Sequence, residues 1–284
     1  MKTFTTPDTM RAWSRAARAE GHTIAVVPTM GALHEGHIAL IETARSMADG
    51  VIVTIFVNPL QFNESTDFDL YPRPIDDDVA ICTSLGVDAV YAPTAATMYP
   101  TGFQTHVEPG DLADRLEGPM RPGHFRGVTT VVTKLLTATV ADYAIFGQKD
   151  YQQLAIVKRL VVDLDLGVDI IGVPTVREPD GLALSSRNRR LTPEQRAAAP
   201  AISSALFAAR TAVADGETDP VIVVNRTRSR IDAEPHLSAE YVELVDALTL
   251  TPVEVIDRPC AVLVAAWCGE VRLIDNLVIS PPQI

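Results

Sequence analysis

The sequence predicts an α/β protein with a parallel sheet flanked by helices, followed by a second, smaller α+β domain. In the first half, five short runs of apolar residues alternate with helical patterns. These runs are continuously apolar, which is typical of strands buried on both faces of a parallel sheet. In the second half, helical patterns come first and strand patterns follow. The length of 284 residues is about twice that of a typical domain and also favours two domains.

Helical segments separate the five expected strands of the first domain. The strands occupy residues 23–27, 51–57, 89–91, 143–146 and 169–173. The helices occupy residues 38–48, 76–85, 128–140 and 152–164. Apolar residues that recur with a helical period indicate the helix at 38–48. An acidic first turn, which suits the positive end of the helix dipole, indicates the helix at 76–85.

A polar, turn-rich stretch at residues 176–181 marks a boundary in the chain. We therefore expect domains at residues 1–176 and 177–284. Beyond the boundary, Thr192 and Gln195 match a capping box with a proline at the first helical position. The expected helices of this domain are residues 196–214 and 221–231, and the expected strands are residues 240–245, 261–266 and 271–277.

The composition excludes several classes of function. Lys and Arg total 24 and Asp and Glu total 36, and the net charge of −12 argues against nucleic acid or an anionic membrane as the main partner. Cys82, Cys260 and Cys268 are widely spaced, so we expect reduced thiols and neither a disulfide framework nor a thiolate zinc site. The N-terminus lacks a signal-peptide pattern, and no run approaches the roughly 20 apolar residues that span a bilayer. We expect a cytoplasmic protein.

The segment PTMGALHEGH lies where the first strand leads into a helix. A helix start at this edge of a parallel sheet is suited to bind phosphate, and Gly31 and Gly36 allow a ligand to approach the backbone. His34 and His37 are three residues apart and project from one face. His37 stands where a Walker loop has lysine, and the spacing is one residue short of a zincin motif. Two solvated histidines at a helix start are the alternative interpretation.

Polar side chains also follow two other expected strands. Asn58 and Gln61 come after the second strand and can donate to a carboxylate or a hydroxyl, although Asn-Pro is also a common turn signal. Lys149 lies at a further strand-to-helix junction, where it can neutralise a phosphate, and Gln153 lies about one turn later. Asp150 can orient Lys149, bond a ribose hydroxyl or simply cap the helix.

Two basic, Gly- or Ser-containing loops complete the set of candidate segments. RPGHFRG precedes a helix and suits an anion-binding loop, with an exposed loop as the alternative. LSSRN lies at the domain boundary, where two hydroxyls and Arg187 can surround phosphate oxygens, with a polar linker as the alternative.

Taken together, the segments PTMGALHEGH, FVNPLQF, RPGHFRG, FGQKDYQQ and LSSRN resemble the pantothenate synthetase (pantoate–β-alanine ligase) family of HxGH nucleotidyltransferases, in order and spacing. The resemblance covers nearly the whole chain. It implies a Rossmann-like doubly wound parallel sheet that binds nucleotide and pantoate, a smaller C-terminal α+β lid domain, and a homodimer. It also implies the family's reaction, in which ATP and pantoate give pantoyl adenylate and pyrophosphate, and β-alanine then displaces AMP.

The resemblance assigns roles to matching residues. His37 is the principal catalytic histidine, His34 assists at the phosphates, and Lys149 binds phosphate. The residues implied to contact ATP are Met30, Gly31, Ala32, Leu33, His34, Glu35, Gly36, His37, Gly147, Gln148, Lys149, Asp150, Val176, Leu184, Ser185, Ser186 and Arg187. The residues implied to bind pantoate are Gln61 and Gln153, and Asn58 is a further candidate. Magnesium accompanies the triphosphate, with Asp77 as its ligand. Family members often have Glu where Gln148 stands.

Three other functions fit parts of the sequence. A different nucleotidyltransferase on the same fold would share the histidine motif, but the segments around Gln61 and Lys149 suit a carboxylate-bearing polyol better. A zinc hydrolase would use His34, His37 and His124. A nucleotide-binding regulator without turnover is the third alternative.

Overall fold

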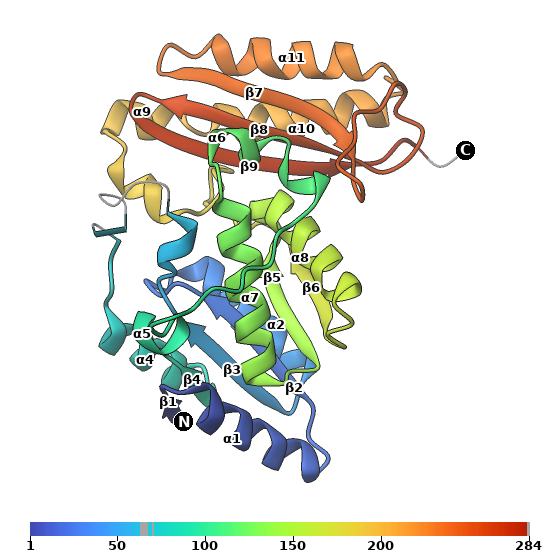
Figure 1. The fold of residues 1–284 in the computed structure, drawn as a ribbon. Coiled ribbons are helices and arrows are strands. Elements are labelled where there is room, and N and C mark those ends of the chain that lie inside the picture. Colours follow the sequence, from blue (N-terminus) through green and yellow to red (C-terminus); the bar gives the residue numbers. More distant parts are fainter. Residues whose placement is uncertain (63–67, 70, 283–284) are drawn as a thin grey trace. The chain divides into compact units, whose positions relative to one another are not determined.

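The computed structural model describes residues 1–62, 68–69 and 71–282, and the chain forms two compact units (Figure 1). Unit 1 comprises Met1–Gln148 and Gln152–Pro174. Unit 2 comprises Lys149–Tyr151 and Thr175–Ile284. The division into functional domains at residues 1–176 and 177–284 remains a prediction. The short segment Lys149–Tyr151 belongs by its contacts to the second unit, although its neighbours in sequence belong to the first.

Unit 1 is built on a six-stranded sheet in which every neighbouring pair is parallel. The strand order is β1-β4-β3-β2-β5-β6. The strands are β1 (Lys2–Phe4), β2 (Ile24–Thr29), β3 (Gly50–Ile55), β4 (Ala89–Tyr91), β5 (Tyr143–Gly147) and β6 (Asp169–Val173). The predicted fold class is confirmed, and β1, which the sequence analysis did not expect, forms an edge of the sheet.

Helices cover both faces of this sheet, as in a doubly wound fold. The helices are α1 (Pro7–Ala19), α2 (Glu35–Met47), α4 (Ile75–Ser84), α5 (Ala95–Met98), α6 (Glu117–Met120), α7 (His124–Thr139) and α8 (Tyr151–Asp163). Single 3-10 turns lie at η1 (Pro59–Gln61), η2 (Asp111–Ala113) and η3 (Gln148–Asp150). Along β2, Ile24 and Val26 pack with α1, α7 and α8, while Ala25 and Val27 pack with α2 and α4. The strands are therefore buried on both faces, which explains their continuous apolar runs.

The sheet changes its winding direction between β2 and β5. The chain proceeds from β2 to β3 and β4 on one side, then crosses to β5 and β6 on the other side of β2. In an open parallel sheet, ligands bind at the carboxyl ends of the strands at this point. The segment that follows β2 contains His34 and His37, so the topology places both histidines at the expected binding edge.

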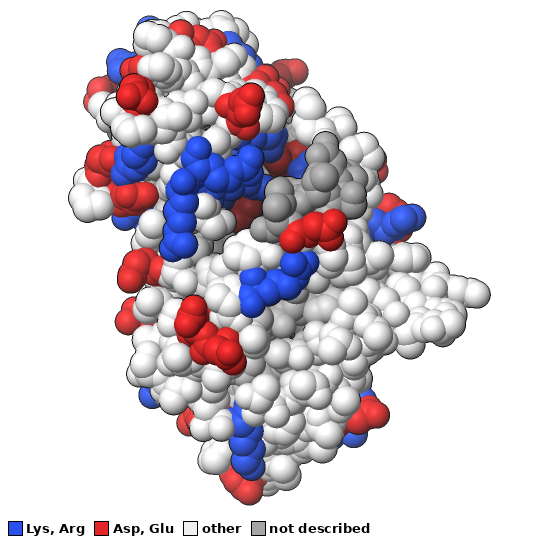
Figure 2. Space-filling model, turned by 90° about the vertical axis from the view of Figure 1, so that its left-hand side faces the viewer, with Lys and Arg blue, Asp and Glu red and all other residues white. Residues whose placement is uncertain are grey.

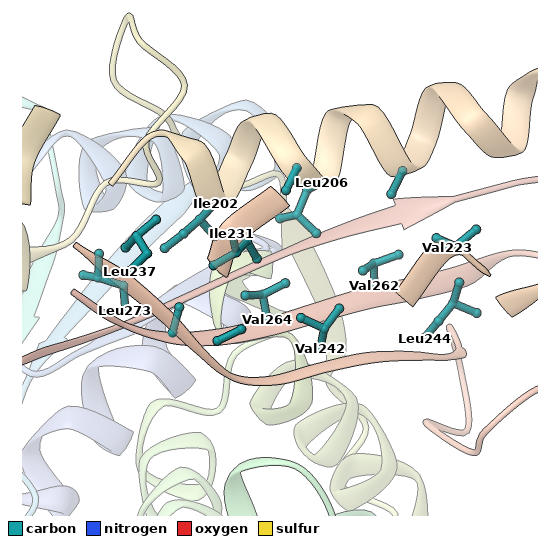
Figure 3. Close-up of a cluster of buried hydrophobic side chains, with 14 of the residues drawn as sticks. Ile202, Leu206, Val223, Ile231, Leu237, Val242, Leu244, Val262, Val264 and Leu273 are labelled. Atoms are coloured by element: carbon teal, nitrogen blue, oxygen red, sulfur yellow. The ribbon is translucent and has the colours of Figure 1, made fainter. Parts of the chain in front are cut away.

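Unit 2 contains a three-stranded antiparallel sheet that packs against two helices (Figure 3). Its strands are β7 (Leu237–Asp246), β8 (Cys260–Cys268) and β9 (Val271–Ile279). Its helical segments are η4 (Ser186–Arg190), α9 (Pro193–Ala198), α10 (Ala201–Ala214) and α11 (Pro220–Asp232). Figure 3 shows Ile202 and Leu206 directed toward the sheet, in which β8 contains Val262 and Val264. The predicted helix at 196–214 is wrong as a single element, because Pro200 lacks an N–H group and separates α9 from α10.

Within the described part of the chain, Pro193–Ala214 meets a length and hydropathy criterion for crossing a membrane, with 22 residues and a mean hydropathy of 1.3. Buried core helices of globular domains also meet this criterion. Ile202, Leu206 and Val213 on this segment pack into the core of unit 2, so its apolar character is explained by that packing. Cys82, Cys260 and Cys268 are all buried free thiols.

Candidate functional site

The loop that follows β2 has a constrained backbone. Gly31 and Ala32 both adopt positive φ angles, 79° and 53°. This conformation is strained for alanine and persists only when surrounding contacts hold it. The buried carboxylate of Asp78 provides such contacts, because it accepts main-chain N–H bonds from Ala32 at 2.9 Å and Leu33 at 2.8 Å. A Cβ on Gly31 would lie 2.7 Å from Oδ2 of Asp78, so glycine is required there.

Asp78 is a residue that the sequence reasoning missed. Asp76 and Asp77, its neighbours in the first turn of α4, are exposed, whereas Asp78 is 1% exposed. A signal was present in the sequence, because Asp78 lies four residues before Cys82 and therefore shares the buried face of the helix. Within this acidic run, Asp78 therefore holds the loop that follows β2, and its neighbour Asp77 is the predicted magnesium ligand.

His34 and His37 cap the start of α2 reciprocally. His34 Nδ1 accepts the main-chain N–H of Gly36 at 3.1 Å, and His37 Nδ1 accepts the main-chain N–H of His34 at 3.3 Å. The two ring centroids are 4.2 Å apart. An Nδ1 that accepts a hydrogen bond bears no proton, so this network assigns the proton of each neutral ring to Nε2. In this form each ring carries one N–H donor, at Nε2.

Gly36 is explained by the same arrangement. A Cβ at this position would lie 2.8 Å from Cε1 of His34, closer than real side-chain contacts. The glycine of the HxGH motif therefore makes room for the first histidine ring over the backbone of the first helical turn. Glu35, also implied to contact ATP, is exposed in this turn.

Asn58 and Gln61 come together beside this loop. Asn58 is buried, and its Nδ2 donates to Oε1 of Gln61 and to the Gly127 carbonyl, both at 3.1 Å. The Tyr99 hydroxyl donates to Oδ1 of Asn58 at 2.7 Å, and burial raises the pKa of that phenol, so it stays a donor at neutral pH. Because Oε1 of Gln61 is occupied, its Nε2 is presented, and it lies 3.0 Å from the Met30 sulfur. The structure thus pairs the amide of Gln61 with the nucleotide-loop candidate Met30.

The basic segment RPGHFRG contacts the main chain of Gln61. His124 Nδ1 lies 2.9 Å from the Gln61 carbonyl oxygen, and Arg121 donates to the same oxygen at 3.4 Å. A Cβ on Gly127 would lie 2.2 Å from the Leu60 carbonyl oxygen, so α7 can approach η1 only with glycine there. These residues hold the main chain of Gln61 in place.

A second group of candidates surrounds a small pocket in unit 2. Lys149, Ser185 and Arg187 line this pocket together with Asn188 and Arg272. Ser185 caps η4, with its hydroxyl oxygen accepting the N–H of Arg187 at 3.2 Å. On the face drawn in Figure 2, Lys and Arg side chains gather in one region with Asp and Glu side chains near them. Asp275 also lines the pocket but is paired with Arg177, and Arg272 is paired with Glu240 at 2.6 Å, so Lys149 and Arg187 are the cations that we expect to meet a phosphate group there.

Asn188 adds an acceptor to the same pocket. Its Nδ2 donates to Glu178 at 3.2 Å and to the Ala183 carbonyl at 3.0 Å, which fixes the orientation of the amide. Its buried Oδ1 has no hydrogen-bond partner within the described ranges. Two further residues that are implied to contact ATP are hydrogen-bonded to each other in unit 2. The Leu184 N–H donates to the Val176 carbonyl at 2.9 Å.

The remaining candidates lie in several places. Gly147 ends β5 and Gln148 follows it in unit 1, whereas Lys149 and Asp150 belong to unit 2. Gln153 is half-buried in the first turn of α8, and Ser186 is exposed in η4. Within residues 1–62, 68–69 and 71–282, no group of three or more His, Cys, Asp or Glu side chains is arranged to hold a metal, which gives the zinc hydrolase alternative no support. A wider hollow of unit 2, about 690 Å³ and bordered by Thr211 and Arg226, contains none of the candidates.

Comparisons with known proteins agree with one another over the full length. A family model described as pantoate-beta-alanine ligase matches residues 2–278. The pantothenate synthetase of Myxococcus xanthus is 51% identical over 268 residues, with 93% of this chain and 91% of that protein covered. That of Chelativorans sp. is 50% identical over 279 residues, with 98% of both chains covered.

Solved structures give the same result. The crystal structure of pantothenate synthetase from Thermus thermophilus is 42% identical, covers 99% of this chain and 100% of its own, and has a TM-score of 0.92. The pantoate-beta-alanine ligase of Francisella tularensis, complexed with beta-gamma ATP and beta-alanine, is 36% identical, covers 98% of this chain and 97% of its own, and has a TM-score of 0.80. The family and the enzyme class expected from the sequence are thereby confirmed, and this chain belongs to the pantoate–β-alanine ligase family.

Proposed function

We propose that this chain ligates pantoate and β-alanine to pantothenate at the expense of ATP, with release of AMP and pyrophosphate. The observation that supports this most directly is the likeness, over 98% of this chain, to a relative complexed with beta-gamma ATP and beta-alanine. The reaction proceeds through a pantoyl adenylate. A pantoate carboxylate oxygen bonds to the α-phosphorus as the bond to pyrophosphate breaks, and the β-alanine amine then attacks the acyl carbon and displaces AMP.

The first step brings two anions together, so its barrier is mainly electrostatic and positional. His37 and His34 contribute Nε2–H donors at the start of α2, where the helix dipole also favours negative charge. Lys149 and Arg187 neutralise the phosphates that leave as pyrophosphate, since both line the pocket of unit 2. We assign the two groups of residues to one ATP molecule.

Pantoate is held mainly by neutral amides in this proposal. Gln61 presents Nε2 because Asn58 occupies its oxygen, so Asn58 acts through Gln61 as well as being a candidate for direct contact. A second amide comes from Gln153 in the first turn of α8. A cation would bind the substrate carboxylate so tightly that its attack on phosphorus would be slowed. Neutral donors bind the carboxylate more weakly and avoid this cost.

Magnesium is the metal that we assign to the triphosphate. Mg²⁺ usually keeps several waters and binds phosphates plus only one or two carboxylates. The exposed carboxylate of Asp77 fits this requirement, whereas both oxygens of Asp78 already accept main-chain bonds. We further propose that unit 2 acts as a lid that protects the hydrolysable adenylate from water, and that the enzyme is a cytoplasmic homodimer.

An omission assay tests the function. The purified chain is incubated with ATP, Mg²⁺, pantoate and β-alanine, and AMP and pantothenate are measured with each component left out in turn. We expect stoichiometric AMP and pantothenate only in the complete mixture. Formation of ADP, or AMP release with a different acceptor in place of pantoate, would instead support another nucleotidyltransferase or ligase.

A further inference from the structure

The segment Lys149–Tyr151 is attached to unit 2 by two hydrogen bonds. Asn276 Nδ2 in β9 donates to the main-chain carbonyl of Lys149 at 2.8 Å. The Tyr151 hydroxyl donates to the Ala247 carbonyl, also at 2.8 Å. Burial raises the pKa of the Tyr151 phenol, so it remains protonated and able to donate at neutral pH. The two bonds flank the backbone of Lys149 and Asp150 on either side.

Asn276 is itself held by a buried ion pair. Arg177 forms a two-bond pair with the neighbouring Asp275, at 2.6 Å and 2.9 Å, and also donates to the Asn276 carbonyl at 3.3 Å. The Asp275 carboxylate accepts the Asn276 N–H at 2.7 Å as well. Asp275 and Asn276 are 4% and 5% exposed, so these bonds are shielded from water.

Arg177 is fixed in turn by the boundary segment of unit 2. Its guanidinium donates to the Gly181 carbonyl at 3.1 Å and stacks over the Phe207 ring, 5.2 Å from the ring centroid. A continuous set of contacts therefore runs from α10, which contains Phe207, through Arg177 and β9 to the backbone of Lys149. Asp275 and Lys149 both line the pocket that contains Ser185 and Arg187.

We propose that Asn276 and Tyr151 are positioning residues that hold Lys149 within the anion-binding pocket of unit 2. The inference rests on the proposed role of Lys149 at the phosphates of ATP. Lys149 follows β5 closely in sequence, and without the two bonds its backbone would be constrained mainly by that strand. With them, its ammonium group stays grouped with Arg187 and Ser185 as one preorganised subsite.

The test uses near-isosteric variants of the full chain. Tyr151→Phe removes only the hydroxyl, and Asn276→Asp replaces the donor by an acceptor of similar size. Matched controls are Tyr143→Phe in β5 and Asn225→Asp on the exposed side of α11. Binding of inorganic pyrophosphate, measured by calorimetry, is the primary readout because it does not require ligase activity. Thermal unfolding of each variant is recorded alongside.

We expect Tyr151→Phe and Asn276→Asp each to weaken pyrophosphate binding between about 10- and 100-fold, the scale of a misplaced group, while both controls bind as wild type. In a Lys149→Ala background, the same substitutions should weaken binding less than about twofold further, because the side chain that they position is gone. A purely structural role would give additive losses. Additive losses, or wild-type binding by both variants, would overturn the proposal. Absence of ligase activity in the wild type would contradict the proposed function instead, while the binding series still decides this inference.

Discussion

The loop of unit 1 and the pocket of unit 2 are organised by opposite means. In unit 1, the Gln61 side chain is oriented by the neutral amide of Asn58, and a buried acid, Asp78, accepts backbone N–H bonds and holds the loop. In unit 2, the pocket contains cations, and a buried acid, Asp275, binds Arg177. In the proposed mechanism, different parts of the chain therefore place the substrate and neutralise its charge. Neutral amides suit a nucleophilic carboxylate, whereas cations suit a leaving pyrophosphate.

Removing the key donor from each region should give the largest effects. His37→Ala and Lys149→Ala are each expected to slow adenylate formation about 10²–10³-fold, the usual cost of losing one donor to developing charge. The measurement is rapid-quench single turnover with saturating ATP and pantoate. Lys158→Ala, an exposed lysine on α8, is the charge-matched control. Adenylate formation at the wild-type rate in either variant would remove that residue from the mechanism.

An intermediate effect is expected from the residue that holds the loop of unit 1. Asp78→Asn keeps the size but faces one main-chain N–H with an amide donor, so the strained backbone at Ala32 should shift. We expect kcat/KM for ATP to fall by up to about 10²-fold, the cost of misplacing reacting groups by about an ångström. Steady-state kinetics of Asp78→Asn beside Asp76→Asn, an exposed neighbour, provide the check. Equal behaviour of the two variants would show that the loop does not depend on this carboxylate.

The smallest effect is expected for Gln61, a candidate pantoate ligand whose loss should change substrate binding more than the chemical step. Gln61→Ala removes one neutral donor, and we expect KM for pantoate to rise about fivefold with little change in KM for ATP, since a neutral hydrogen bond contributes roughly 1 kcal/mol. The exposed Gln104→Ala serves as control. An unchanged KM for pantoate would argue against Gln61 as a pantoate ligand, and a raised KM for ATP alone would place this amide at the nucleotide.

Much of unit 1 was predictable because local patterns decide it. Continuous apolar runs identified five strands, and the loops at their ends identified the candidates on the binding edge. The edge strand β1 has only three residues and no apolar run, so no periodic signal marked it. Pro200 interrupts an otherwise uniform Ala-rich pattern, and the Ala-rich composition on both sides of it favours one continuous helix where the structure has two.

The parts that could not be predicted depend on long-range contacts or on helix phase. Gln152, adjacent to the candidate Gln153, is buried and bonds Leu112, Arg115 and Glu117. Gln152 differs from Gln153 only in its position on the helix, because Gln152 lies on the same face of α8 as the buried Ile156. The bond between Asn276 and Lys149 joins residues 127 positions apart, and no local pattern indicates such a contact.

In the proposed reaction, the chain activates pantoate by adenylation before β-alanine is needed. The decisive measurement is the exchange of labelled pyrophosphate into ATP with Mg²⁺ and without β-alanine. We expect exchange by the wild-type protein only when pantoate is present. Exchange that proceeds without pantoate, or exchange that requires β-alanine as well as pantoate, would contradict it.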